Sequence, residues 1–279
     1  MHKYSPVVRL DLESRPEAVT LVRSTLAAVA DALELEPELR DELRTAVSEA
    51  CNNVVLHAYG GEPGPLTLLI STESDGIEVL VQDRGSGIQH VSSRAGRMGL
   101  GLAVISALTE RVEFSTRPFG GTEVRMIFSW DGSDKPVVEP AALDQLPERQ
   151  ADLDGRVVAS FVPNRLLGPV LGRLGRATAA QARFTADGVA LLPAATDAIA
   201  AYAEHMSPDG HVSFSIDSTT RRLEVIAGPL RSDAGGNTDD MAVSLWTALA
   251  PLVETPELEE RGGRQFARLT IVDDRVSAA

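Results

Sequence analysis

The feature that most constrains this chain is an order of predicted strands and helices that repeats on the two sides of an acidic, proline-containing segment. Each side predicts a strand, two helices, a hairpin, another helix and a closing strand or hairpin. Short motifs recur in the same order: Ala46 to Ala50 as Ala194 to Ala198, Glu78 to Val81 as Glu224 to Ala227, Leu102 to Val104 as Met241 to Val243, and Gly120-Gly121 as Gly262-Gly263. Four matches in order indicate a tandem duplication.

The segment between the two copies has no apolar periodicity. Between Trp130 and Arg156 it carries three prolines and seven acidic residues against two basic ones. Such a composition is typical of a solvated linker. For a chain of 279 residues, we therefore predict a domain at 1–130, a linker at 131–155 and a second domain at 156–279, each domain large enough to bury its own core.

Periodicity within each copy predicts the α+β class. Ser14 and Glu17 have the spacing of a capping box at the start of the first helix. In the first copy we expect a strand at 7–12, helices at 19–33 and 37–57, strands at 66–71 and 77–83, a helix at 101–109, and strands at 112–115 and 122–129. In the second we expect a strand at 157–162, helices at 165–180 and 189–206, strands at 211–217 and 223–227, a helix at 241–253 and a strand at 266–272. Helices on one face of a mixed, mostly antiparallel sheet form a two-layer α/β sandwich.

Charge and composition exclude several functions. A formal charge of −14 repels a phosphate backbone, so we expect no nucleic-acid partner. The sequence has no apolar run of membrane-spanning length and no signal-peptide pattern at its start, and its single cysteine, Cys51, cannot form an internal disulfide. These features predict a cytoplasmic protein that does not bind membranes.

Two polar residues on the second predicted helix, Glu49 and Asn53, are four positions apart and so share one face. A carboxamide oxygen there could ligate Mg²⁺, which prefers a few hard oxygen ligands together with phosphate oxygens. The carboxylate could take a proton from an attacking hydroxyl. His57 extends the same stripe. Taken alone, this pattern favours a solvent-facing helix face.

Aspartate and glycines follow in two further motifs. Asp83 ends a hydrophobic strand and precedes Gly85 and Gly87, where a carboxylate could accept a hydrogen bond from a base amine and glycines let the backbone approach a flat ring; a simple turn fits almost as well. Gly99 and Gly101 then open a helix, where unpaired N–H groups can bind phosphates.

Together these three motifs resemble the nucleotide site of the histidine kinase-like ATPase superfamily, whose domain is the Bergerat-type sandwich. Ser48 to Asn53 and the following His57-Ala58-Tyr59 are similar to the anti-sigma factor serine/threonine kinases. The resemblance covers about residues 5–130.

The resemblance implies roles for the matching positions. Asn53 would ligate Mg²⁺, in preference to Asn52, and Glu49 would be the general base. Asp83 would bind the adenine amine of ATP. The other positions implied to contact the nucleotide are Gly85, Gly87, Arg97, Gly99, Leu100, Gly101 and Thr122.

The resemblance also implies partners: a sigma factor, an anti-sigma factor antagonist, or both. It favours an ATP-dependent protein serine/threonine kinase; the alternative is a nucleotide-gated binding module without phosphotransfer. A sensor histidine kinase is disfavoured because no helix pair upstream presents a phospho-accepting histidine.

The second copy lacks the nucleotide motifs. The repeat places Ala201 at the position of Asn53 and Pro229 at that of Asp83. The positions of Gly85, Gly87, Gly99 and Gly101 are taken, in order, by Arg231, Asp233, Thr238 and Asp240. We expect this copy to bind no nucleotide. Because kinases of this kind are typically homodimers, the second copy could mimic a dimer partner.

Overall fold

The computed structural model describes residues 7–72, 76–87, 100–117, 120–129, 152–161, 166–206, 211–231 and 253–274. The chain divides into two compact units, residues 1–146 and 147–279. None of the described helices combines the length and hydropathy that crossing a membrane requires.

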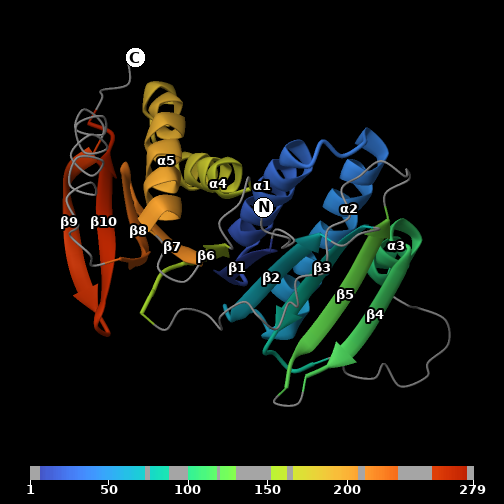
Figure 1. Ribbon diagram of the computed structural model, residues 1–279. Helices are drawn as coiled ribbons and strands as arrows, with labels where there is room; N and C mark the ends of the chain where they lie inside the picture. Colours follow the sequence, from blue (N-terminus) through green and yellow to red (C-terminus); the bar gives the residue numbers. More distant parts are fainter. Residues whose placement is uncertain are drawn as a thin grey trace. The chain divides into compact units, whose positions relative to one another are not determined.

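The first unit is one antiparallel sheet with helices on one face (Figure 1). Its strands lie in the order β1-β2-β3-β5-β4, and every pairing within this order is antiparallel. This arrangement confirms the predicted α+β sandwich. In chain order the elements are β1 (Val7–Glu13), α1 (Pro16–Ala32), α2 (Pro37–Asn53), the π-helix η1 (Val54–Ala58), β2 (Pro65–Thr72), β3 (Gly76–Asp83), α3 (Leu100–Leu108), β4 (Arg111–Thr116) and β5 (Thr122–Ser129).

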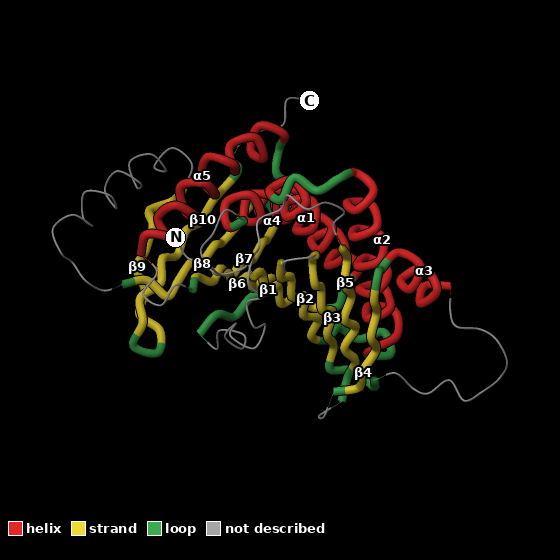
Figure 2. The backbone as a smooth tube through the Cα atoms, turned by 45° about the vertical axis from the view of Figure 1, so that its right-hand side comes forward, coloured by secondary structure: helices red, strands yellow, loops and turns green. Residues whose placement is uncertain are grey.

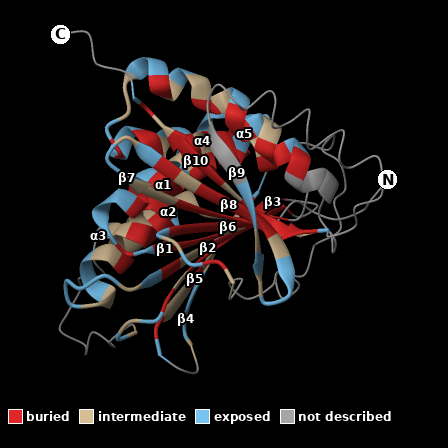
Figure 3. Cartoon of the chain, turned by 90° about the vertical axis from the view of Figure 1, so that its left-hand side faces the viewer, coloured by how far each residue is buried: buried red, intermediate tan, exposed pale blue. Residues whose placement is uncertain are grey.

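Every second residue of β3 belongs to one buried apolar row on a single face of the sheet. In β3, Ile77, Val79 and Val81 are almost completely buried and continue directly into Asp83. Paired residues of an antiparallel sheet share a face, so Leu66, the partner of Asp83 in β2, belongs to the same row. Figure 3 shows buried residues running along the strands and the helix faces. The nucleotide candidate Asp83 is thus the polar end of an apolar row.

The predicted capping box is wrong. Helix α1 begins after Arg15, and no side chain caps it. The Ser14 hydroxyl instead accepts the Gly64 N–H at 2.9 Å, while the Ser14 N–H donates to the Gly64 carbonyl at 2.8 Å. Glu13 and Pro65 are the last registered pair of β1 and β2, so these two hydrogen bonds extend the ladder by one residue. The Ser14 hydroxyl is bonded there and not at the start of α1.

The second unit repeats the topology. Its strands lie in the order β6-β7-β8-β10-β9, again antiparallel throughout. Figure 2 shows the helices of this unit against its strands. The described elements are β6 (Val157–Phe161), α4 (Leu167–Gln181), α5 (Ala186–Met206), β7 (Val212–Thr219), β8 (Arg222–Leu230), β9 (Val253–Arg261) and β10 (Arg264–Val272).

Strand β9 was not predicted. The helix expected at 241–253 lies outside the described residues except for Val253, which begins β9, so the prediction is wrong at that residue. The strand is acidic and contains Pro256, which hides its β pattern. Charges on the neighbouring strand compensate: Arg268 is hydrogen-bonded to Glu259, and this bond lowers the pKa of the Glu259 carboxyl.

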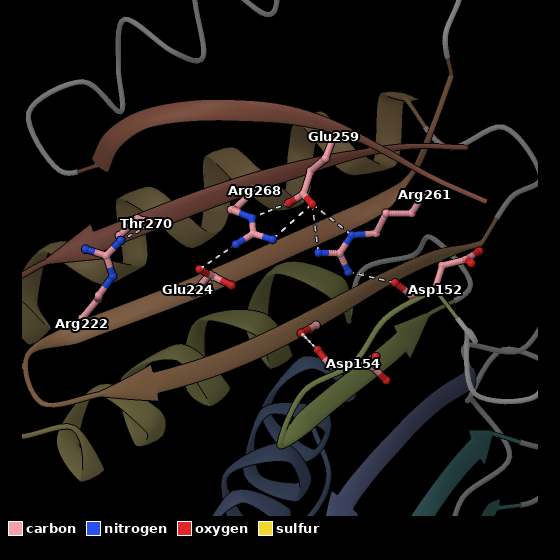
Figure 4. A network of polar contacts seen from close by, with 9 residues as sticks. Asp152, Asp154, Arg222, Glu224, Glu259, Arg261, Arg268 and Thr270 are labelled. Carbon is pink, nitrogen blue, oxygen red and sulfur yellow. Dashed lines mark hydrogen bonds and ion pairs between the residues drawn. The ribbon is translucent and has the colours of Figure 1, made fainter. Parts of the chain in front are cut away.

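An ion-pair ladder crosses β8, β10 and β9 (Figure 4). Arg268 joins Glu224 to Glu259, and Arg261 joins Glu259 to the main-chain carbonyl of Asp152 at 2.9 Å. Leu153 is fully buried in a cluster with Val158, Ile226 and Phe266. The packed second unit therefore starts before residue 156, because residues 152–155 lie against its sheet.

Matching details in the two units favour the predicted duplication. Glu78 of β3 pairs with Arg125 of β5 at 2.7 Å, and Glu224 of β8 pairs with Arg268 of β10 at 3.1 Å. Each glutamate lies two residues before the residue that faces its arginine across the ladder. The same ion pair thus recurs at the same place in the same topology.

The turns between the paired helices also match. α1 and α4 end in the same hydrogen-bonding pattern, with Glu34 at φ 53° and Arg183 at φ 60°. Left-handed residues other than glycine are uncommon, so their recurrence is informative. When the two turns are aligned on Glu34 and Arg183, the helices that follow them align one residue further along than in the sequence comparison. Asn53 then corresponds to Tyr202 rather than to Ala201.

Candidate functional site

Helix α2 presents Glu49 and Asn53, one turn apart and both partly exposed. The first turn of α3 packs directly on Glu49: a Cβ added at Gly101 would lie 2.2 Å from Glu49 Oε1. Only glycine permits this approach without displacing the carboxylate. The structure therefore brings together two of the predicted positions, from helices more than 45 residues apart in the sequence.

Asp83 is a buried carboxylate, 4% exposed, at the end of β3. Its Oδ1 accepts the Gly85 N–H at 2.7 Å. Within the described part of the chain, no hydrogen bond is formed by its Oδ2. A carboxylate can accept several hydrogen bonds, so Asp83 has capacity left to accept one from a ligand.

Glycines allow three segments to meet around Asp83. A Cβ at Gly85 would lie 2.1 Å from the Ala58 carbonyl, and one at Gly121 would lie 2.1 Å from the Asp83 carbonyl. Gly87 has a φ of 76°, in the left-handed region that favours glycine. Gln82 pairs with Glu123, which sets Thr122 opposite Asp83 on the same face of the sheet. The loop after β3 is thus held between the end of η1, which continues α2, and the β4–β5 turn.

The helix containing Glu49 ends in a π-helical turn, η1, that the sequence did not predict. Wider turns change the angular spacing of side chains, so exposed His57 does not continue the stripe of Glu49 and Asn53 in the way a regular helix would predict. The turn directs the Ala58 carbonyl to the Ser86 N–H, at 3.0 Å. Turns of this kind are frequent at functional sites.

Tyr59, just after this turn, is a site residue whose role sequence reasoning missed. Its hydroxyl accepts the Arg84 N–H at 2.7 Å and donates to the Pro65 carbonyl at 2.5 Å. Burial raises the pKa of the phenol, so the proton needed for the second bond is retained at neutral pH. The only available signal was the motif His57-Ala58-Tyr59, noticed for its family likeness.

Two other observations limit the chemistry. Cys51 lies between Glu49 and Asn53 in the sequence but is fully buried, and burial raises the pKa of its thiol to about 12. Such a thiol is a poor nucleophile. Among the described residues, no three His, Cys, Asp or Glu side chains gather as a metal site would require.

Some predicted positions cannot be placed. Arg97 and Gly99 lie outside the described residues. Leu100 is the first residue of α3, and nothing is described of its side chain.

Known proteins match this half of the chain. Residues 12–128 match the histidine kinase-like ATPase domain family. An anti-sigma F factor of Thermoanaerobacter sp. (strain X514) is 29% identical over 143 residues, covering 48% of this chain and 99% of that protein. The serine-protein kinase RsbW of Bacillus pumilus (strain SAFR-032) is 29% identical over 130 residues, covering 40% of this chain and 80% of that protein. This half of the chain is a histidine kinase-like ATPase domain, and it is similar to the anti-sigma factor kinases.

The ATPase domain thus has the topology and the ATP-binding fold that the sequence motifs predicted. The family match ends at residue 128, so it does not extend to the second unit. There, Tyr202 and Pro229 occupy the positions that correspond to Asn53 and Asp83, and Tyr202 is only 8% exposed. Neither side chain is a carboxamide or a carboxylate.

Proposed function

We propose that this protein binds ATP with Mg²⁺ and phosphorylates a serine or threonine of an anti-sigma factor antagonist. The observation that carries the proposal is the contact between Glu49 and the first turn of α3, with Asn53 one helical turn away. It sets a carboxylate beside a helix start that can receive phosphates. The names of the relatives, anti-sigma F factor and serine-protein kinase RsbW, support the choice of reaction and partner.

The two ends of the site would hold different parts of the nucleotide. Asp83 would accept a hydrogen bond from the adenine amine, with Gly85, Gly87 and Thr122 close to the base. At the other end, the N–H groups of Leu100 and Gly101 begin α3 and are free of helical partners. They would bind phosphate oxygens, together with Gly99 and Arg97 in the preceding segment.

Glu49 and Asn53 would serve the reaction itself. ATP would supply the terminal phosphoryl group, and ADP would leave. Asn53 would coordinate Mg²⁺, a role that fits a single carboxamide oxygen because Mg²⁺ commonly takes its other ligands from phosphates and water. Glu49 would orient the attacking hydroxyl and accept its proton, while the N–H groups of α3 stabilise the charge on the transferred group.

The second unit would bind no nucleotide. Tyr202 and Pro229 stand at the positions of Asn53 and Asp83, so this unit lacks the side chains proposed to ligate Mg²⁺ and to bind the adenine amine. A copy that keeps the topology and the ion pair but lacks the ligands is suited to binding protein, and we propose that it stands in for the partner subunit of a homodimer.

The experiment that tests the proposed function is a phosphorylation assay on the intact chain. The protein is incubated with Mg²⁺-ATP and candidate antagonist domains, and phosphoserine or phosphothreonine is located by mass spectrometry. We expect phosphate on one antagonist residue. Nucleotide-dependent binding of sigma factor or antagonist without any transfer would instead identify a nucleotide-gated binding module.

Replacing Gly101 tests the contact with Glu49. In Gly101→Ala the new methyl group would force the Glu49 carboxylate aside, since its Oε1 lies within 2.2 Å of the Cβ position. Because alanine favours helices over glycine by about 1 kcal/mol, the domain should remain folded. We expect at least about a tenfold loss of phosphotransfer, the scale of a misplaced catalytic group, with the melting temperature nearly unchanged.

The matched control is Ser106→Ala, at an exposed position of the same helix. It should leave the rate of transfer unchanged. A Gly101→Ala protein with full activity would show that the position of Glu49 beside α3 is not needed.

A further inference from the structure

Tyr59 lies where three segments of the ATPase domain meet: the end of the π-helical turn, the start of β2 and the loop after β3. Its hydroxyl is bonded to one backbone group in each of the last two, at 2.5 Å to the Pro65 carbonyl and 2.7 Å from the Arg84 N–H. The ring fits against Gly64, where a Cβ would lie 2.3 Å from a ring carbon. One phenol therefore ties the loop to the sheet.

The loop that Tyr59 holds is the one that carries Asp83. The two N–H groups that follow Asp83 are both used: that of Arg84 by Tyr59 and that of Gly85 by the Asp83 carboxylate itself. On the other side, Gly121 packs against the Asp83 carbonyl. The backbone at Asp83 is thus fixed from both sides, and the carboxylate keeps a single orientation.

Orientation matters here because a hydrogen bond weakens steeply when its angle or length departs from the optimum. Loss of the bond from Arg84 frees the peptide that joins residues 83 and 84. The Asp83 carboxylate would then rotate with that peptide, while contacts made elsewhere along a nucleotide would be untouched. Tyr59 can therefore influence recognition of one end of the ligand without touching it.

We propose that Tyr59 is a positioning residue that holds Asp83 for the exocyclic amine of a purine and so sets the preference of the site for adenine. The proposal rests on the proposed function of the domain as an ATP-binding one.

The test compares ATP with purine riboside triphosphate, which lacks only the 6-amino group, by calorimetric titration of the intact protein. A hydrogen bond to a charged group contributes enough that the wild type should prefer ATP by about tenfold or more. In Tyr59→Phe we expect this preference to fall by about fivefold, the scale of one well-oriented hydrogen bond. Affinity for the deamino analogue should change less than about twofold, since that ligand never used the bond.

Tyr202→Phe is the control, because it removes a tyrosine hydroxyl from a mostly buried side chain in the second unit. It should leave both affinities unchanged. Gly64→Ala is a second variant that keeps the hydroxyl but pushes the ring away. It should lower the preference as Tyr59→Phe does, and it keeps the proposal testable should Tyr59→Phe fold poorly.

Three results are informative. A reduced preference in both variants supports the positioning role. Equal loss of affinity for both ligands, or an unchanged preference, would overturn it while leaving the proposed function intact. A wild type that binds ATP and the deamino analogue equally well would overturn the assignment of Asp83 as the residue that reads the base, and the positioning role with it.

Discussion

Asp83→Asn should weaken ATP binding by about 30- to 1000-fold, corresponding to roughly 2–4 kcal/mol for a mismatched hydrogen bond to a formerly charged group. The carboxylate has two acceptor oxygens, one used by the Gly85 N–H and one left for the adenine amine. Asparagine has one acceptor and one donor group. Whichever way the amide turns, a donor faces either Gly85 or the base, and one buried hydrogen bond is lost.

Calorimetric titration with ATP measures this loss directly. Asp197→Asn, an exposed acidic position on α5, is a control with the same change of charge and should bind ATP normally. Because asparagine has nearly the same shape as aspartate, the melting temperature without nucleotide should show that the domain is folded. ATP affinity equal to that of the wild type would refute the site at Asp83.

Glu49→Gln should reduce the rate of phosphotransfer by about 100-fold or more, which is the range that a general base contributes. Glutamine has the size of glutamate and can stay beside Gly101, but it cannot accept the proton of the attacking hydroxyl. ATP affinity should change less than about threefold, because the proposed contact of this side chain is with the acceptor hydroxyl rather than with the nucleotide.

Single-turnover assays of antagonist phosphorylation, combined with ATP titrations, separate these two quantities. Glu42→Gln, two turns earlier on the same helix, removes a carboxylate of equal size and should leave the rate unaltered. A normal rate in Glu49→Gln would leave positioning and charge stabilisation as the whole of catalysis, and Glu49 would have no role as a base.

Periodicity predicted most of the fold because the core follows it. Val19, Val22, Leu26 and Val29 are buried as their spacing indicates, and Ile77, Val79 and Val81 form one row. Strand β9 was missed because its stability depends on pairing with β10. Its glutamates resemble a loop in the sequence, and the ion pairs that Arg261 and Arg268 form with Glu259 become visible only in the fold.

The sequence supplied candidate residues for the site but not the contacts among them. The spacing of Glu49 and Asn53 within one helix is a local property. The approach of Gly101 to Glu49 and the use of Tyr59 to hold Arg84 join residues from separate segments, and a sequence carries no local record of them. Ser14 failed as a helix cap for the same reason, since its competing partner, Gly64, lies 50 residues away.

The π-helical turn at Val54–Ala58 has a consequence for how this domain tolerates insertions and deletions. A π turn accommodates one more residue than an α turn does. Removing a single residue from this stretch would let the helix close up regularly. The Ala58 carbonyl would then withdraw from Ser86, and the Tyr59 hydroxyl from Arg84, although every side chain at the site would still be present. The number of residues between Asn53 and Tyr59 is therefore part of the site. A chain shortened there would keep the motif residues but lose the hydrogen bonds that hold the loop after β3 in place.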